Sequence, residues 1–293
     1  MRSLLFVPGD SERKLAKGLE AGADTLLLDL EDSVAADRKP EARRITAAFI
    51  GENRKRAPAA LYVRVNDFTT GLADDDLAAV MPARPAGIML PKAVGAKDVE
   101  RLSAKLRVHE AENGIEDGAT RIVAIITETA AGLLAAPSFG EAHPRLAGLT
   151  WGAEDLSSDI GARTPRDGDG RYTDVFRLAR TLTILAASAA QTAAIDTVFV
   201  NFRDMEALKV ECVEAERDGF TAKMAIHPAQ VPVINEVFTP SAETVAHSRA
   251  VVEAFAAAGN PGVIGIDGHM YDRPHLRRAE RILARARAAD VGK

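Results

Sequence analysis

The chain has 293 residues, of which 47% are hydrophobic and 27% charged, and its formal net charge is −5. These values are ordinary for a globular protein, and the mild acidity without a basic run argues against nucleic acid as a partner. Residues 1–10 reach a Pro-Gly turn too early for a signal peptide, and no apolar run approaches about 18 residues, so we expect a cytoplasmic protein without a membrane span.

The first half of the chain alternates short apolar runs with stretches of helical period. The second apolar run is continuous in leucine, which is typical of a strand buried on both faces of a parallel sheet. Ser11 is the expected N-cap of the first helix. The pattern predicts strands at residues 3–7, 25–30, 60–65, 87–90 and 121–127, and helices at residues 11–19, 40–49 and 97–113.

The second half continues the alternation as far as residue 226. It predicts strands at 146–151, 197–201 and 223–226, and helices at 174–190 and 205–217. The only cysteine, Cys212, falls within the last of these helices. A single thiol forms no internal disulfide and lacks the partners of a zinc site, so we interpret it as an apolar filler.

Eight alternations of strand and helix, without an antiparallel hairpin signature, predict a (β/α)8 TIM barrel. A doubly wound open sheet is the alternative, but no Gly-x-Gly-x-x-Gly follows any predicted strand. We expect residues 1–238 to form the catalytic barrel and residues 239–293 an appendage. Because this tail follows the eighth strand, we expect it to meet a neighbouring subunit.

Charged residues gather where the predicted strands end, which is where barrel enzymes place their active sites. A surplus of carboxylates at one rim is costly unless a cation or a basic ligand neutralises it. The charged residues at these ends are Asp29, Glu31, Asp32, Arg64, Lys92, Glu128 and Asp155.

Glu128 and Asp155 end adjacent predicted strands, so they are the candidate ligands of a Mg²⁺ ion, which prefers one or two carboxylates with water and substrate. Spacing alone leaves an alternative open, because strand-end carboxylates also cap the helices that follow. Asp29, Glu31 and Asp32 have a further interpretation, in which they hold Arg64 or Lys92 in place. Arg64 has little reason to be buried except to meet an anion.

Eight short motifs occur in an order that resembles the HpcH/HpaI aldolase/citrate lyase family. The resemblance is to its citrate lyase β-subunit-like branch, which includes malyl-CoA and citramalyl-CoA lyases, and it covers nearly the whole chain. The motifs are LFVPGD at 5–10, LDLEDS at 28–33, VRVN at 63–66, LPK at 90–92, TET at 127–129, GAED at 152–155, IHP at 226–228 and DGHMYD at 267–272.

The resemblance implies a role for each candidate residue. Glu128 and Asp155 match ligands of Mg²⁺, with Mn²⁺ as a substitute, and Arg64 matches the arginine that faces the reacting carbonyl oxygen. Asp272 matches an acid/base that reaches into a neighbouring subunit's site. A 2-oxo acid carboxylate would bind to the backbone of Gly152, Ala153, Glu154 and Asp155. Coenzyme A would be contacted by Phe6, Arg13, Lys17, Ile226 and His227. The residues that would support the site from behind are Asp29, Glu31, Asp32 and Lys92.

Each of these roles has a plainer alternative. Arg13 and Lys17 are four apart and share a helix face, which is also the pattern of a solvated basic patch. His227 could be a packed histidine, and Asp272 could cap the helix that starts near Pro274. The chain also departs from the family's pattern at Asn201, where an acidic residue is expected, and at Phe6, where some relatives have tyrosine.

The resemblance implies a Mg²⁺-dependent retro-Claisen lyase that cleaves a 3-hydroxyacyl-CoA such as malyl-CoA or citramalyl-CoA. The products would be acetyl-CoA or propionyl-CoA and a 2-oxo acid, and the oligomer a homotrimer or a multiple of it. The alternatives are a citrate lyase β subunit acting on a carrier-protein thioester, a CoA-independent HpcH-type aldolase, and a non-catalytic protein that binds oxo acids or CoA.

Overall fold

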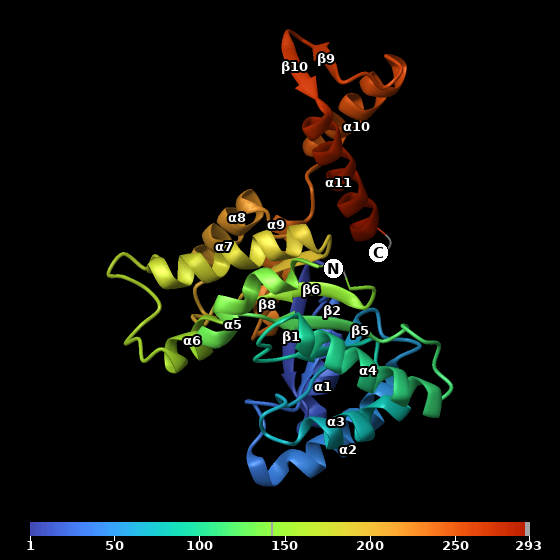
Figure 1. Ribbon diagram of the computed structural model, residues 1–293, viewed down its shortest axis with the longest axis vertical. Helices are drawn as coiled ribbons and strands as arrows, with labels where there is room; N and C mark the ends of the chain where they lie inside the picture. The colour runs from blue at the N-terminus through green and yellow to red at the C-terminus, as the bar shows by residue number, and fades with distance from the viewer. Residues whose placement is uncertain (142, 291–293) are drawn as a thin grey trace.

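Eight parallel strands close into a barrel in the computed structural model, which describes residues 1–141 and 143–290. Each strand pairs with the next along the chain, and β1 pairs with β8, which confirms the expected TIM barrel (Figure 1). The strands are β1 (Ser3–Pro8), β2 (Thr25–Asp29), β3 (Ala60–Arg64), β4 (Gly87–Leu90), β5 (Arg121–Ile125), β6 (Leu146–Thr150), β7 (Ala193–Asp196) and β8 (Ala222–Ala225).

The barrel closes around two apolar layers, because alternate side chains of a strand point to opposite faces. Leu27, Val123 and Met224 pack inside the barrel, whereas Leu26 and Leu28 pack outside it, against the helices. The helices that surround the barrel are α1 (Glu12–Leu19), α2 (Lys39–Asn53), α3 (Ala73–Val80), α4 (Ala96–Glu112), α5 (Ala130–Ala135), α6 (Ala153–Asp159), α7 (Asp174–Ala189), α8 (Met205–Asp218) and α9 (Val231–Phe238).

The seventh strand begins at Ala193, so the expectation of a strand at 197–201 is wrong in position. The β-branched residues around Val198 favoured the later segment. The helix before it, α7, ends at Ala189, close to the predicted end at residue 190, and Gln191 then takes a left-handed conformation with φ 54° and turns the chain directly into β7. Residues 197–201 therefore form the loop at the rim of the barrel.

The tail folds into an appendage of two helices and a hairpin: α10 (Ala242–Ala257), β9 (Val263–Ile266), β10 (His269–Asp272) and α11 (Arg273–Asp290). The antiparallel pairing of β9 with β10 was not expected. Its signal is Asp267-Gly268, a two-residue turn in which both residues have positive φ, 48° and 79°, as hairpin turns require.

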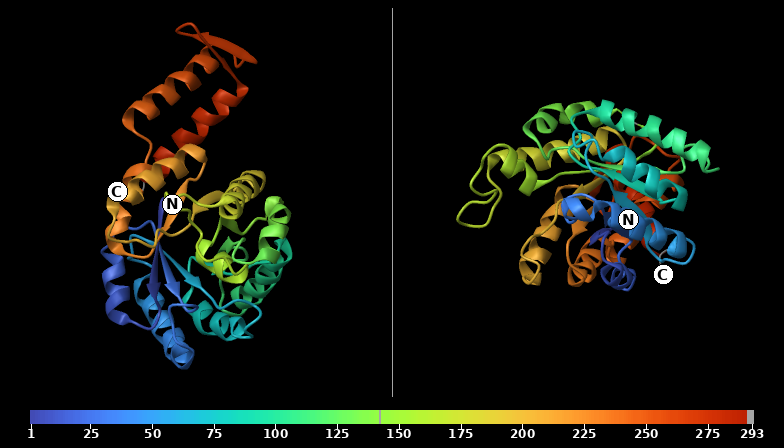
Figure 2. Two further views of the ribbon diagram at one scale, coloured as in Figure 1. Left: turned by 90° about the vertical axis from the view of Figure 1, so that its left-hand side faces the viewer. Right: turned by 90° about the horizontal axis from the view of Figure 1, so that it is seen from below.

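The appendage leaves the barrel at the end where the strands begin and extends away from it (Figures 1 and 2). Arg2, at the start of β1, donates a hydrogen bond through Nη1 to Thr239 Oγ1 at 2.9 Å. Phe255 and Leu276 pack in a small core of the appendage's own, and Arg285 pairs with Glu216 of α8 at 3.1 Å. The described helices include none with the length and apolar character of a membrane span.

Candidate active site

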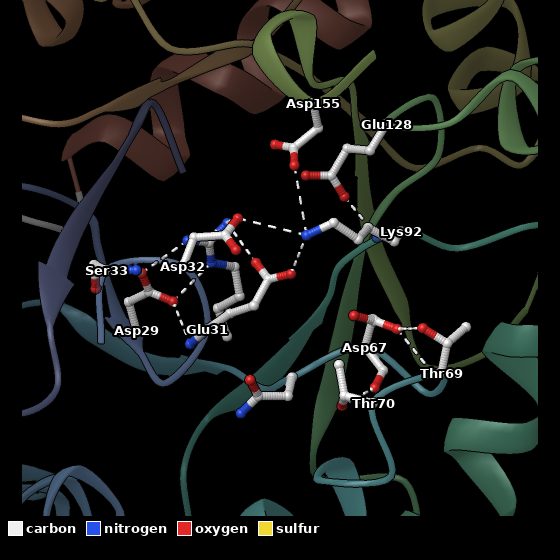
Figure 3. Close-up of polar contacts among 12 residues, drawn as sticks. Asp29, Glu31, Asp32, Ser33, Asp67, Thr69, Thr70, Lys92, Glu128 and Asp155 are labelled. Carbon is white, nitrogen blue, oxygen red and sulfur yellow. Dashed lines mark hydrogen bonds and ion pairs between the residues drawn. The ribbon is translucent and has the colours of Figure 1, made fainter. Parts of the chain in front are cut away.

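The structure brings the predicted charged residues together at the rim where the strands end (Figure 3). Asp29 ends β2, Arg64 ends β3, Lys92 follows β4, Glu128 follows β5, and Asp155 lies in the first turn of α6. These residues come from five successive strand-helix units, so only closure of the barrel places them in one site.

Arg64 is held from two sides by carboxylates. Its Nε and Nη2 donate to the two oxygens of Asp29, each at 2.7 Å, and its Nη1 lies 2.8 Å from Glu31 Oε2. Burial alone would lower the pKa of Arg64, but the charges of Asp29 and Glu31 outweigh it and raise that pKa. Asp29 also accepts hydrogen bonds from the backbone N–H groups of Glu31 and Ser33, so the guanidinium rests on a rigid turn.

Lys92 occupies the middle of the rim. Its ammonium pairs with Glu31 and lies 3.5 Å from Asp32 Oδ2 and 3.5 Å from Asp155 Oδ1 (Figure 3). Its backbone N–H donates to Glu128 Oε2 at 2.5 Å. Although burial lowers the pKa of Lys92, its contact with Glu31 outweighs burial and raises it, so this side chain is a permanent cation.

Glu128 is the acid of the site whose ionised form is least favourable. Burial, followed by repulsion from Asp155 and Glu31, raises the pKa of Glu128 to about 8. Burial also raises the pKa of Glu31 to about 7, in spite of Arg64 and Lys92. The local positive charge is therefore too small for the carboxylates present, as is expected where a further cation binds.

The donor set fits a hard divalent cation. Figure 3 shows the carboxyl groups of Glu128 and Asp155 next to one another, both toward Lys92. Within the described residues, no group of three or more His, Cys, Asp or Glu side chains is placed to hold a metal ion. Mg²⁺ needs only one or two carboxylates, since water and substrate complete its octahedron.

Gly152 makes room for Glu128. A Cβ on this residue would lie 2.6 Å from Glu128 Cγ, so any side chain here would displace the carboxylate. Gly152 is also the residue before α6, and the backbone of Gly152–Asp155 thus passes beside Glu128. The side chain of Glu154 is exposed and points to no described ion-pair partner.

Two residues behind the rim were not predicted from the sequence as part of the site. Lys39 donates through Nζ to the backbone oxygens of Leu30 and Glu31 at 2.9 and 3.0 Å and to Asn66 Oδ1 at 2.7 Å. Asn66 in turn donates to Asp76 Oδ2 at 2.7 Å. These bonds fix the backbone of the segment that carries Glu31. Asn66 could have been found in the VRVN motif, whereas no local signal marks Lys39.

The predicted CoA contacts lie around β1 and β8, which are neighbours in the barrel. Arg13 and Lys17 are exposed on α1 and form no ion pair with a described residue. Ile226 is 39% exposed, and His227 stacks on Phe202 with 5.0 Å between ring centroids. His227 is exposed rather than packed in the core, and its Nδ1 accepts a hydrogen bond from the backbone of residue 229.

Phe6, the remaining predicted CoA contact, lies in β1 and packs against Arg64, whereas Asp272 lies outside the barrel. The Arg64 guanidinium sits 4.7 Å above the centroid of the Phe6 ring, so Phe6 faces the charged residues of the rim. Asp272 lies on the appendage, where Oδ1 is 2.6 Å from His275 Nδ1, and the structure does not bring it to the rim of its own barrel. The hydrogen bond from His275 lowers the pKa of Asp272.

Comparison with known proteins identifies the family of the site. The family model described as HpcH/HpaI aldolase/citrate lyase matches residues 2–228. The chain is 34% identical to a (3S)-malyl-CoA thioesterase of Cereibacter sphaeroides, over 98% of this chain and 95% of that protein. It is 32% identical to a mitochondrial citramalyl-CoA lyase of Rattus norvegicus, over 97% and 86%.

One solved structure that resembles this chain contains bound ligands. The protein CitE of Mycobacterium tuberculosis, in complex with magnesium, acetoacetate and coenzyme A, superposes with a TM-score of 0.77 at 34% identity. The match covers 97% of both chains, so it includes the appendage as well as the barrel.

Proposed function

This chain belongs to the HpcH/HpaI aldolase/citrate lyase family, and on that premise we propose that it is a Mg²⁺-dependent carbon–carbon lyase acting on a 3-hydroxyacyl-CoA such as malyl-CoA or citramalyl-CoA. The products are acetyl-CoA or propionyl-CoA and a 2-oxo acid. The observation that carries the proposal is the buried carboxyl group of Glu128, whose pKa is raised by burial and by the neighbouring Asp155, at a rim that also holds Arg64.

Glu128 and Asp155 hold the metal in this proposal, and the excess of negative charge at the rim is what attracts it. When bound, Mg²⁺ supplies Lewis acidity to the carboxylate and hydroxyl oxygens of the substrate's malyl-like end. Lys92 lies 3.5 Å from Asp155 and has Glu31 as a second anchor, so its ammonium keeps a partner when Asp155 turns to the cation.

Arg64 stabilises the oxygen that changes charge in the reaction. The hydroxyl becomes a carbonyl as the bond to the thioester α-carbon breaks, and a fixed guanidinium nearby lowers the energy of the anionic species. The bidentate contact with Asp29 and the ring of Phe6 hold the guanidinium in place before substrate arrives, so no reorganisation is needed at that moment.

The rest of the substrate lies along residues from the same rim. The backbone N–H groups of Gly152–Asp155, at the start of α6, bind the 2-oxo acid carboxylate. Arg13 and Lys17 face the CoA phosphates as a pair of cations on one face of α1. Ile226 and His227 border the pantetheine arm.

Asp272 of a neighbouring subunit completes the site. The appendage starts at the opposite end of the barrel from the rim, so Asp272 serves a second copy of the chain, in a homotrimer or a multiple of it. The reaction balances without another reagent, because the hydroxyl proton ends on the thioester α-carbon and Asp272 carries it. Asp272→Asn should bind substrate while kcat falls roughly 10²–10⁴-fold.

A panel of thioesters tests the proposal. Malyl-CoA, citramalyl-CoA, β-methylmalyl-CoA and a citryl carrier-protein thioester are incubated with Mg²⁺ or with EDTA, and 2-oxo acid, acyl-CoA and free thiol are measured. A lyase releases a 2-oxo acid and an acyl-CoA in equal amounts, only with Mg²⁺. Free CoA without an oxo acid would instead mark thioester hydrolysis, and no product from any CoA thioester would contradict the proposal.

A further inference from the structure

A closed ring of six side chains lies outside the barrel, between its last three strands and the segment that follows α6. Trp151 follows β6, Asp196 ends β7, and Lys223 lies in β8. These three side chains are no more than 1% exposed, and none of them is part of the reaction described above. The members of the ring are Trp151, Arg166, Tyr172, Asp196, Glu211 and Lys223.

Four hydrogen bonds make up the first part of the ring. Trp151 donates through Nε1 to Asp196 Oδ1 at 2.8 Å, and Lys223 donates through Nζ to Asp196 Oδ2 at 2.7 Å. Lys223 also donates to Glu211 Oε1 at 2.8 Å. The other oxygen of Glu211 accepts from Arg166 Nη2 at 2.6 Å.

Aromatic contacts close the ring. The guanidinium carbon of Arg166 lies 3.8 Å from the centroid of Tyr172, and the ring of Tyr172 meets that of Trp151 edge-on at 5.0 Å and 69°. Arg166 and Tyr172 also pair as an isolated antiparallel bridge. Every member therefore touches two others, and no member can move without breaking a contact.

The ring joins the segments on either side of α6, the seven-residue helix that carries Asp155. Trp151 directly precedes Gly152, the N-cap of the helix, and Arg166 and Tyr172 lie in the segment between α6 and α7. A helix of two turns has little stability of its own. Contacts outside the helix must therefore fix its direction. Asp159, its last residue, accepts a hydrogen bond from the backbone N–H of Ala130 at 2.7 Å, and the ring holds the segments before and after the helix.

The buried charges of the ring are not expected to add much to the stability of the fold. Removing a lysine and its two carboxylate partners from water costs about as much as their attraction returns. What such a network provides is a fixed geometry, because Asp196, Glu211 and Lys223 each bind two partners of the ring at once.

We propose that this ring positions Asp155 against Glu128 and so sets the affinity of the site for its divalent cation. Arg166 and Lys223 are positioning residues that act through Trp151 and Tyr172. The inference rests on the proposed metal site. Supporting groups behind metal ligands typically change affinity roughly 10–100-fold when they are substituted.

Two substitutions in the ring test the inference. Trp151→Phe removes the indole N–H and keeps an aromatic ring, and Arg166→Gln removes a charge that is partly exposed, so both should leave the barrel folded. The matched control is Arg145→Gln. Arg145 is buried just before β6 and pairs with Glu110 at 2.6 Å. Its substitution therefore breaks a similar ion network at the other end of the same strand.

Two measurements are made on the metal-free proteins: Mn²⁺ affinity by electron paramagnetic resonance, and amide hydrogen exchange over residues 151–159. We expect both ring variants to bind Mn²⁺ at least about 10-fold more weakly and to exchange faster in α6, while Arg145→Gln changes neither. Unchanged exchange and affinity in the ring variants, or equal changes in Arg145→Gln, would overturn the inference. If the wild-type protein binds no Mn²⁺, the proposed metal site fails, and hydrogen exchange alone then decides whether the ring holds α6.

Discussion

Glu128 and Glu31 are the acids of the rim whose carboxylates are most costly to ionise, because both are buried and each repels a neighbour. Arg64 and Lys92 reduce that cost without removing it. At the scale of the residue, the site is therefore built to receive positive charge, and substitutions there should change cation binding before they change the fold.

Asp155→Ala tests the proposed metal ligand directly. We expect much weaker Mg²⁺ or Mn²⁺ binding and loss of turnover, because Glu128 alone must then hold a cation that two carboxylates hold in the wild-type protein. Isothermal titration with Mn²⁺ and the thioester assay measure the two effects. Glu214→Gln, which removes an exposed carboxylate on α8, is the control and should match the wild-type protein. Full activity of Asp155→Ala would contradict the assignment.

Glu128→Gln should change how the stability of the metal-free protein depends on pH. The pKa of Glu128 in the folded protein, about 8, lies above its ordinary value of 4.5, so between these values the folded state binds more protons than the unfolded state. The free energy of unfolding should therefore fall as pH rises, by up to about 1.4 kcal/mol per pH unit.

The neutral amide of Glu128→Gln removes this dependence. Denaturant unfolding in EDTA from pH 5.5 to 8.5 should show a flatter profile for the variant than for the wild-type protein. Added Mg²⁺ should stabilise the wild-type protein more at pH 8 than at pH 6, because the cation competes with the proton for Glu128. Parallel profiles for the two proteins would show that Glu128 is not the group responsible.

Arg64→Lys should separate catalysis from metal binding. A lysine cannot reproduce the bidentate contact with Asp29, so the positive charge is no longer fixed in place. We expect kcat to fall roughly 10²–10³-fold, as for loss of one oriented donor to a developing oxyanion. Mn²⁺ affinity should stay within about twofold of the wild-type value. Steady-state kinetics and titration with Mn²⁺ check the two parts, and a change in KM alone would argue against the role.

At the scale of the element, α6 matters most, because one short helix supplies Asp155 and its start lies against Glu128. The contact depends on the missing side chain of Gly152. No single interaction explains the position of α6, which depends on the close backbone approach at Gly152 and, in our proposal, on the ring that holds the segments before and after the helix.

Gly152→Ala should weaken metal binding without unfolding the barrel. The added Cβ would lie 2.6 Å from Glu128 Cγ, so the carboxylate must move. We expect the dissociation constant for Mn²⁺ to rise at least about 10-fold. Gly168→Ala is the matched control, because its Cβ would meet nothing within 4 Å and its φ is not positive. Equal Mn²⁺ affinities in the two variants would show that Gly152 plays no such part.

At the scale of the whole molecule, the barrel and the appendage present different chemistry at opposite ends. The rim holds the carboxylates, and the appendage holds Asp272 in contact with His275. A site that needs both must be shared between copies of the chain, which makes the oligomer a requirement for turnover in the proposed mechanism.

Mixing two inactive variants tests shared sites. Asp155→Ala lacks a proposed metal ligand and Asp272→Asn lacks the proposed acid/base, so each homo-oligomer should keep only a small fraction of wild-type activity. Coexpression should restore about a quarter of wild-type activity, because one site in four combines an intact rim with an intact neighbouring appendage. Activity of the coexpressed mixture relative to each variant alone is the measurement. No recovery in oligomers shown to be mixed would mean that each appendage serves its own barrel.

The alternation of apolar runs was enough to predict the barrel, because a strand buried on both faces and the helix after it leave a pattern within a few residues. The same reasoning placed Asp29, Arg64, Lys92, Glu128 and Asp155 at one rim, since every parallel strand ends there. Local pattern misplaced the seventh strand, where the left-handed Gln191 decides the start, and missed the hairpin at Asp267-Gly268.

Contacts between distant segments were decided only by the tertiary structure. Four such contacts join residues that are far apart along the chain. They are the bidentate contact of Asp29 with Arg64, the approach of Gly152 to Glu128, the bond from Lys39 to Asn66, and the ring through Lys223. Such contacts depend on register, closure and burial together. A short stretch of sequence records which side chains are present, but their mutual geometry exists only once the whole barrel has closed.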